Sequence, residues 1–173
     1  MKRRGFTLVE LLVVLAIAVI LLVIAVPGYV SLVNSSRLTS TTNDLILALH
    51  LARSEAIKRG TRVTVCKSSN PGASVPTCDS SAKWEQGWLL FIDNGVRGAI
   101  DTDDTVLLVH ESIAEWAVIS AVNFNLYFSY LPTGASRGST GLGNDTIKIC
   151  VSGERRDIIV NTVGRPRVRS GTC

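Results

Sequence analysis

Three arginines occupy alternate positions near the end of the chain, within residues 163–169 (VGRPRVR). Alternate side chains of an extended strand share one face, so Arg165, Arg167 and Arg169 are expected on a common side, about 6–7 Å apart. Pro166 fixes its own φ angle and pushes Arg165 towards an extended conformation. Guanidinium groups at this interval are suited to successive phosphates of a nucleic-acid strand.

The tail contains no Phe, Tyr or Trp, so it lacks the stacking platform that single-stranded nucleic acids usually require. This composition favours sequence-independent contact with a duplex backbone. Arg155 and Arg156 are candidates to assist, and a bond from Cys173 to Cys150 would tether the tail to a sheet. The alternative is a solvated basic edge strand that discourages aggregation between sheets, and the residue pattern leaves both interpretations open.

The charge distribution separates this tail from the rest of the chain. The net charge of +4 includes three basic residues in positions 2–4. Residues 6–153 hold 10 basic and 12 acidic side chains, whereas residues 154–173 hold five arginines and two carboxylates. Residues 6–153 are therefore mildly acidic, whereas residues 154–173 are basic, which makes the C-terminal end the candidate for binding an acidic partner.

The opposite end of the chain predicts a membrane segment. Residues 11–26 are an unbroken apolar run, which with its flanks approaches the roughly 20 residues that cross a bilayer as a helix. Residues 2–4 are basic and place the N-terminus in the cytoplasm. Glu10 costs about 2.5–3.5 kcal/mol inside a membrane and therefore needs a partner. The alternative is a plain anchor or uncleaved signal peptide with Glu10 near the interface.

The elements between these ends predict an α+β fold. A long helix is expected over residues 6–59, ended by Gly60, with a possible kink or local melting at Pro27. Its second half carries an apolar stripe: Leu38, Thr42, Leu45, Leu49, Ala52 and Ala56. Antiparallel strands are predicted at residues 61–67, 87–93, 105–110, 124–131, 146–151 and 157–163. Residues 68–83 predict an irregular loop and residues 132–144 a flexible connection, and one helix followed by such strands is α+β.

Four cysteines follow the apolar run, an even number that predicts two disulfides in an oxidising compartment. Three pairings are possible, and the local ones, Cys66–Cys78 and Cys150–Cys173, are favoured. A metal site is not indicated, because the cysteines lack metal-binding spacing and the chain has two histidines.

Other candidate sites are weaker. Residues 93–104 combine aspartates and an asparagine, which suits either a calcium ion or a polar hairpin loop, and the loop is favoured because calcium-loop spacing is absent. His50 and His110 have no nucleophile placed to form a catalytic triad, so an enzyme, a catalytic residue and a cofactor are not predicted. The tryptophans are interpreted as packing residues: Trp84, Trp88 and Trp116.

Residues 5–10 (GFTLVE) resemble the class III leader of type IV pilins and pseudopilins. The resemblance implies cleavage after Gly5 by prepilin peptidase and N-methylation of Phe6. It also implies that Glu10 pairs with the Phe6 amine of a neighbouring subunit. A buried carboxylate is tolerable when an opposite charge meets it, so the resemblance supplies the partner that Glu10 requires.

A second resemblance covers most of the remaining chain. Residues 49–60 (LHLARSEAIKRG), Trp84, Gly87-Trp88, residues 91–93 (FID) and Val106-Leu107 resemble the GspH/FimT family of minor pilins and pseudopilins. This implies a type IV pilin-like fold, in which a long N-terminal helix packs on antiparallel sheets. The implied parts are a leader (1–5), a transmembrane and fibre-core helix (6–30) and a periplasmic domain (31–173), helical to about residue 59.

The family resemblance also implies partners and location. Such proteins reside in the inner membrane as single-pass proteins and then join other major and minor pilins in the fibre or tip. Residues 164–167 (GRPR) resemble the GRxR motif of FimT-type minor pilins, which implies binding of double-stranded DNA through Gly164, Arg165 and Arg167 in natural transformation. Arg169 is added to this site by the alternation of the tail. Two alternatives remain, a structural minor pilin that primes pilus assembly and a minor pseudopilin of a type II secretion system.

Overall fold

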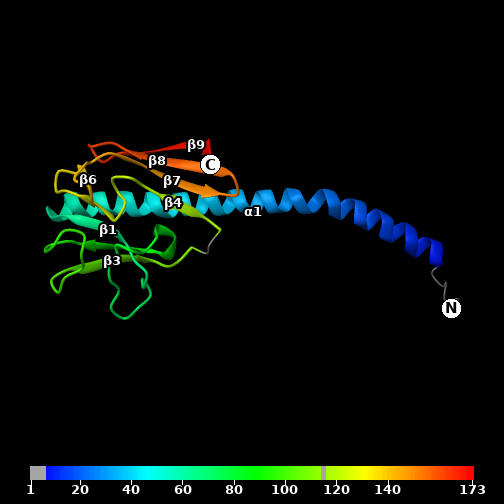
Figure 1. Cartoon of the computed structure of the whole chain (residues 1–173), viewed down its shortest axis with the longest axis horizontal. Helices are drawn as coiled ribbons and strands as arrows, with labels where there is room; N and C mark the ends of the chain where they lie inside the picture. The colour runs from blue at the N-terminus through cyan, green and yellow to red at the C-terminus, as the bar shows by residue number, and fades with distance from the viewer. Residues whose placement is uncertain (1–6, 114–115) are drawn as a thin grey trace. The chain divides into compact units, whose positions relative to one another are not determined.

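The computed structural model of the chain describes residues 7–113 and 116–173 (Figure 1). It divides into two compact units, Met1–Ser36 and Arg37–Cys173, both of which contain part of helix α1 (Leu8–Arg59). All the buried side chains of the described residues lie at Leu38 or beyond, and both disulfides belong to the second unit. Residues 37–173 therefore hold the whole described core.

The first unit is an apolar helix with exposed side chains. Helix α1 is long and apolar enough to cross a membrane. The Thr7 hydroxyl accepts a hydrogen bond from the Glu10 amide at 3.3 Å, which caps the helix start. The helix continues through Pro27, so the predicted local melting there is wrong, since the proline removes only one intrahelical donor.

The second half of α1 forms the centre of the core. All six residues of the predicted apolar stripe are buried, together with Thr41 and Ala48. The Thr42 hydroxyl donates to the Leu38 carbonyl at 2.6 Å, which lets a polar side chain join the stripe. These helix residues share one core with buried side chains from two antiparallel sheets.

The first sheet has the strand order β3-β2-β1-β5-β6. Its strands are β1 (Val63–Lys67), β2 (Trp88–Ile92), β3 (Thr105–His110), β5 (Tyr127–Tyr130) and β6 (Ser136–Gly138). The short helix η1 (Trp84–Gln86) precedes β2. Both β1 and β2 are buried along their whole length, because both faces of the sheet are covered there. Val65 and Leu90 face the core shared with α1, whereas Cys66 and Phe91 belong to a second apolar cluster.

The second sheet has the order β4-β7-β8-β9. Its strands are β4 (Val118–Ser120), β7 (Asp145–Val151), β8 (Glu154–Val160) and β9 (Pro166–Thr172). In the view of Figure 1, β7, β8 and β9 lie above α1, and β1 and β3 lie below it. Ser152 and Gly153 both have positive φ angles and connect β7 to β8, which pairs Val151 with Glu154. The prediction that this strand begins at residue 157 was therefore too late, because the charged residues 154–156 masked its start.

The predicted flexible connection at residues 132–144 is also wrong, because it contains β6. Ser136 is buried, and its hydroxyl lies within hydrogen-bond distance of the carbonyls of Gly143 and Asn161, between which its single proton is shared. Its amide donates to the Thr162 carbonyl at 3.3 Å. Buried polar groups require such partners, and these bonds join β6 to the segment that follows β8.

Candidate nucleic-acid interface

The C-terminal tail is a strand of the second sheet rather than a separate arm. Strand β9 pairs with β8 over seven residues, from Val160 opposite Pro166 to Glu154 opposite Thr172. Among the strands of residues 7–113 and 116–173, none pairs with its other edge, so β9 is an edge strand of this sheet. The disulfide Cys150–Cys173, with Cα atoms 5.9 Å apart, links the end of the tail to β7. Cys66–Cys78 forms the other disulfide, so both favoured pairings are present.

The register separates the two faces of this sheet. Residues directly opposite one another in antiparallel strands share a face. Arg169 is opposite Asp157, which is opposite Lys148, and Arg155 is opposite both Cys150 and Gly171. Arg167 lies two residues from Arg169 on the same face. We call this surface the basic face: Lys148, Arg155, Arg167 and Arg169.

Arg156 lies on the other face, where it is opposite both Ile149 and Ser170. Its Nη1 donates to the Ser170 hydroxyl at 2.5 Å. The two neighbours Arg155 and Arg156 were predicted to assist the same surface, but alternation along β8 directs them to opposite sides. Lys148 was not predicted, because its place on the basic face depends on the β7–β8 register.

Arg165 precedes β9 in a tight turn, where its amide donates to the Asn161 side chain at 2.9 Å. It is exposed, as are Arg167 and Arg169. The strand places Arg167 and Arg169 on one face, and Arg165 lies immediately before the strand.

Gly164 serves this turn. Its φ angle is +79°, and a Cβ atom there would collide with the Gly134 carbonyl and lie 2.6 Å from the Tyr130 ring. The Tyr130 hydroxyl donates to the Gly164 carbonyl at 3.2 Å, and burial raises the pKa of this phenol. The Gly134 carbonyl is itself held by Arg53 Nε of α1 at 3.1 Å. Gly164 is thus required by the fold, whatever else it contacts.

Replacing Gly164 by alanine should lower the free energy of unfolding by about 2 kcal/mol or more, from positive-φ strain and collision with a fixed carbonyl. Gly153→Ala is a matched control, because its φ angle is also positive (+88°) and nothing lies within 4 Å of the added Cβ. It should cost about 1 kcal/mol. Urea unfolding of both variants measures the difference, and equal losses would contradict the packing role of Gly164.

Asp157 lies within the basic face and is 1% exposed. Its carboxylate oxygens lie 2.8 Å from Arg155 Nε and 3.1 Å from Arg169 Nη2. Burial alone would raise the pKa of Asp157, but hydrogen bonds from Arg169 and Arg155 outweigh it and hold the pKa below its usual value. The carboxyl is therefore ionised at neutral pH and neutralises part of the arginine charge.

A groove of about 660 Å³ opens beside these charges. Three cationic side chains and two carboxylates line it together with three asparagines: Lys148, Arg155 and Arg169, Asp145 and Asp157, and Asn123, Asn144 and Asn161. The Asp145 carboxylate accepts hydrogen bonds from the Val122 and Phe124 amides. None of the described residues that line the groove is aromatic, so the surface suits anionic oxygen atoms rather than stacked bases. Gly171 leaves room for Arg155, whose Nη2 would lie 2.9 Å from a Cβ atom at that position.

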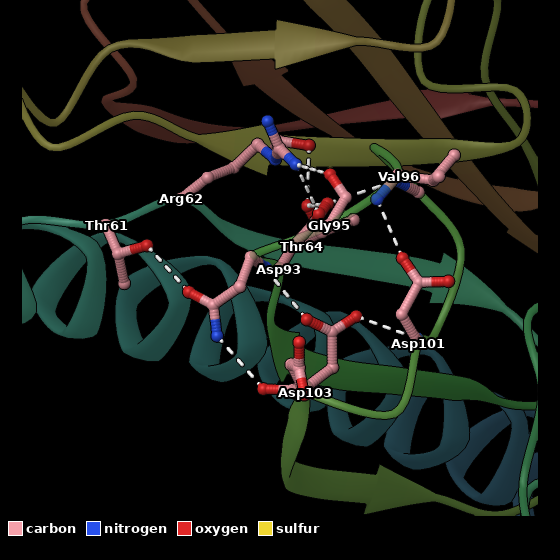
Figure 2. Close-up of polar contacts among 12 residues, drawn as sticks. Thr61, Arg62, Thr64, Asp93, Gly95, Val96, Asp101 and Asp103 are labelled. Carbon is pink, nitrogen blue, oxygen red and sulfur yellow. Dashed lines mark hydrogen bonds and ion pairs between the residues drawn. The ribbon is translucent and has the colours of Figure 1, made fainter.

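The acidic segment has a structural role as a polar hairpin loop between β2 and β3. Figure 2 shows Asp93 facing Arg62 and Thr64, while Asp101 accepts a bond from the Val96 amide. Asp104 accepts bonds from two further backbone amides. Across residues 7–113 and 116–173 no group of three or more His, Cys, Asp or Glu side chains is arranged for a metal ion. The carboxylates of Asp93, Asp101 and Asp104 accept bonds from donors of the protein itself.

The histidines and tryptophans lie apart from the basic face. His50 is exposed on α1, and His110 stacks on Trp88 with ring centroids 3.7 Å apart. Trp84 is buried against Phe128, and Trp116 packs against the Arg37 guanidinium. These contacts agree with the predicted packing roles of the tryptophans.

Glu10 lies in the first turn of α1, and the predicted processing residues Gly5 and Phe6 lie outside the described residues. The prokaryotic N-terminal methylation motif matches residues 1–26. The family model described as type II transport protein GspH matches residues 41–164, most of the chain. This chain belongs to the GspH family. Membership implies assembly with other pilins or pseudopilins, and the methylation motif implies processing by prepilin peptidase.

Solved structures confirm the type IV pilin fold. Two crystal structures of the type IV minor pilin FimU from Pseudomonas aeruginosa, both 15% identical, give TM-scores of 0.54 and 0.56. They cover 76% and 78% of this chain and 92% and 90% of theirs. The minor pseudopilin EpsH of the Type 2 Secretion System of Vibrio cholerae is 12% identical, with a TM-score of 0.53, covering 78% of this chain and 97% of that one. No curated protein sequence matches significantly.

Proposed function

We propose that this GspH-family protein is a minor type IV pilin that binds extracellular duplex DNA without sequence preference, for uptake in natural transformation. The observation that carries the proposal is the basic face with Arg165 beside it, which joins cationic side chains from three strands and the preceding turn. The absence of aromatic side chains among the described groove residues favours backbone contact. Before assembly the protein is held in the inner membrane with residues 31–173 in the periplasm, and afterwards it lies in the fibre or its tip.

Direct binding tests this function. Residues 37–173 contain the whole described core and lack the basic residues 2–4, whose charge would add a separate phosphate contact. The anisotropy of fluorescent duplexes of unrelated sequence should give equal affinities. If about four phosphates are contacted, the affinity should fall on the order of 100-fold between about 50 and 200 mM salt. No affinity at the lowest salt would remove the DNA-binding proposal.

The second candidate is a minor pseudopilin of a type II secretion system, whose partners are other proteins. The GspH family model and the fold shared with EpsH favour it. In that case the basic face is an edge-strand surface that opposes sheet aggregation. A chain without DNA affinity whose deletion abolishes secretion of a type II substrate would establish this candidate, and a structural pilin would instead be needed for pilus formation.

Glu10 is proposed as the assembly contact in either case. A carboxylate within an apolar helix is stabilised in a fibre by a positive amine of a neighbouring subunit. Glu10→Gln should therefore lower incorporation into sheared fibres several-fold while leaving membrane insertion unchanged, as measured by immunoblotting of both fractions. The control is Thr7→Ser, which retains a helix-capping hydroxyl. If the glutamine variant is incorporated normally, Glu10 is not an assembly contact and has only a local role in the first turn of α1.

A further inference from the structure

A buried carboxylate at the centre of a cationic surface requires an explanation. Asp157 reduces the attraction of this face for phosphates, because it neutralises part of the charge of Arg155 and Arg169. Stability alone is a weak explanation, since well-packed apolar residues replace many buried ion pairs without loss. The neighbouring residue on the same face of β8 is Ile159, so an apolar side chain is already accommodated there.

The geometry around Asp157 supplies another explanation. Arg155 comes from the same strand and Arg169 from the neighbouring strand, and one carboxylate contacts both. The Arg169 side chain is 66% exposed and the Arg155 side chain 25%, so both still meet solvent. A guanidinium has five N–H donors in a rigid plane, and Asp157 occupies only some of them. The remaining donors belong to side chains that line the groove beside Lys148.

We propose that Asp157 is a positioning residue that holds Arg155 and Arg169 in one arrangement, ready to donate to a phosphate in the groove. Long arginine side chains lose rotamer freedom when they bind, and an arrangement already fixed in the free protein reduces that loss. The carboxylate lowers the charge of the face but improves its geometry. This inference rests on the proposed DNA binding.

Asp157→Asn separates the two effects, because they change affinity in opposite directions. Loss of a negative charge alone would tighten DNA binding. Loss of the positioning contact should weaken it about 3- to 10-fold and make the salt dependence shallower, although the domain is more positive. The measurement is duplex anisotropy with residues 37–173, below the unfolding temperature of the variant. Equal or tighter binding would overturn the positioning role.

Glu154→Gln is the matched control. Glu154 lies on the same strand and adds the same charge when neutralised, but it is on the other face of the sheet from Asp157. It should bind DNA equally or slightly more tightly than the natural chain. If the natural chain binds no DNA, the proposed function fails; if it binds and Asp157→Asn binds more tightly, only the positioning role fails.

A second variant and a second measurement test the proposal even if Asp157→Asn does not fold. Arg169→Lys keeps the charge and removes the planar fork, so it should weaken binding about 3-fold, and unchanged affinity would overturn the proposal. Nuclear magnetic resonance relaxation of the Arg155 and Arg169 Nε–H groups should show more motion in Asp157→Asn. If backbone amides of β9 instead lose protection while the arginine side chains keep their order, the role of Asp157 is structural and the proposal fails.

Discussion

Replacing Arg165 and Arg167 together by glutamine should weaken duplex DNA binding by residues 37–173 on the order of 30-fold at about 0.1 M salt, since each charged hydrogen bond lost is worth about 1 kcal/mol or more. The log–log salt slope should become shallower by about 1.8, because two fewer phosphates are neutralised. Glutamine keeps polar length and is compatible with this exposed turn and strand. Anisotropy titrations at several salt concentrations measure both quantities.

A charge-matched control distinguishes this surface from the charge of the whole domain. Lys58 and Lys83 are exposed and lie outside the basic face, on α1 and before η1. Changing both to glutamine removes the same number of charges. The affinity should change less than 3-fold, because salt screens charges that lie away from the bound DNA. Equal losses in the two double variants would show that binding depends on net charge, and the basic face would lose its assignment.

Opening the Cys150–Cys173 disulfide should release β9. No residue of this strand is buried, so little apolar burial holds it to the sheet. The strand depends on backbone bonds to β8, on the Arg169–Asp157 ion pair and on the disulfide. A cross-link that closes a loop of this size contributes about 3 kcal/mol. Cys150→Ser with Cys173→Ser should therefore raise amide exchange in β9 on the order of 100-fold and weaken DNA binding.

Hydrogen exchange read by mass spectrometry measures this release peptide by peptide. The control is the pair Cys66→Ser with Cys78→Ser, which opens the other disulfide and leaves β9 attached. Amide exchange in this control should rise mainly in the loop after β1. Because Cys66 is buried, the change also lowers the stability of the whole domain. Comparing exchange in β9 with exchange in β7 of the same variant separates this global effect from release of β9. If the variant with serine at positions 150 and 173 exchanges its β9 amides as slowly as the natural chain, the strand does not depend on this disulfide.

The reliability of the sequence predictions followed the length and periodicity of each element. The apolar stripe from Leu38 to Ala56 was correct at every position, because a helical repeat over several turns is specified by the residues themselves. Strand β3 was predicted with its exact bounds. Strands β4 and β6 were missed, since three residues carry little pattern and Gly138 in β6 indicates a turn when read locally.

The same limit applied to the site. Sequence alone determined the arginine tail, the apolar N-terminal helix and the N-terminal methylation motif, because each is a signal within neighbouring residues. Only the tertiary structure decided that Lys148 joins the basic face, that Arg156 leaves it and that Asp157 lies between two arginines. The physical reason is strand register: side chains far apart in the chain become neighbours through backbone pairing, and a shift of one residue would exchange the two faces.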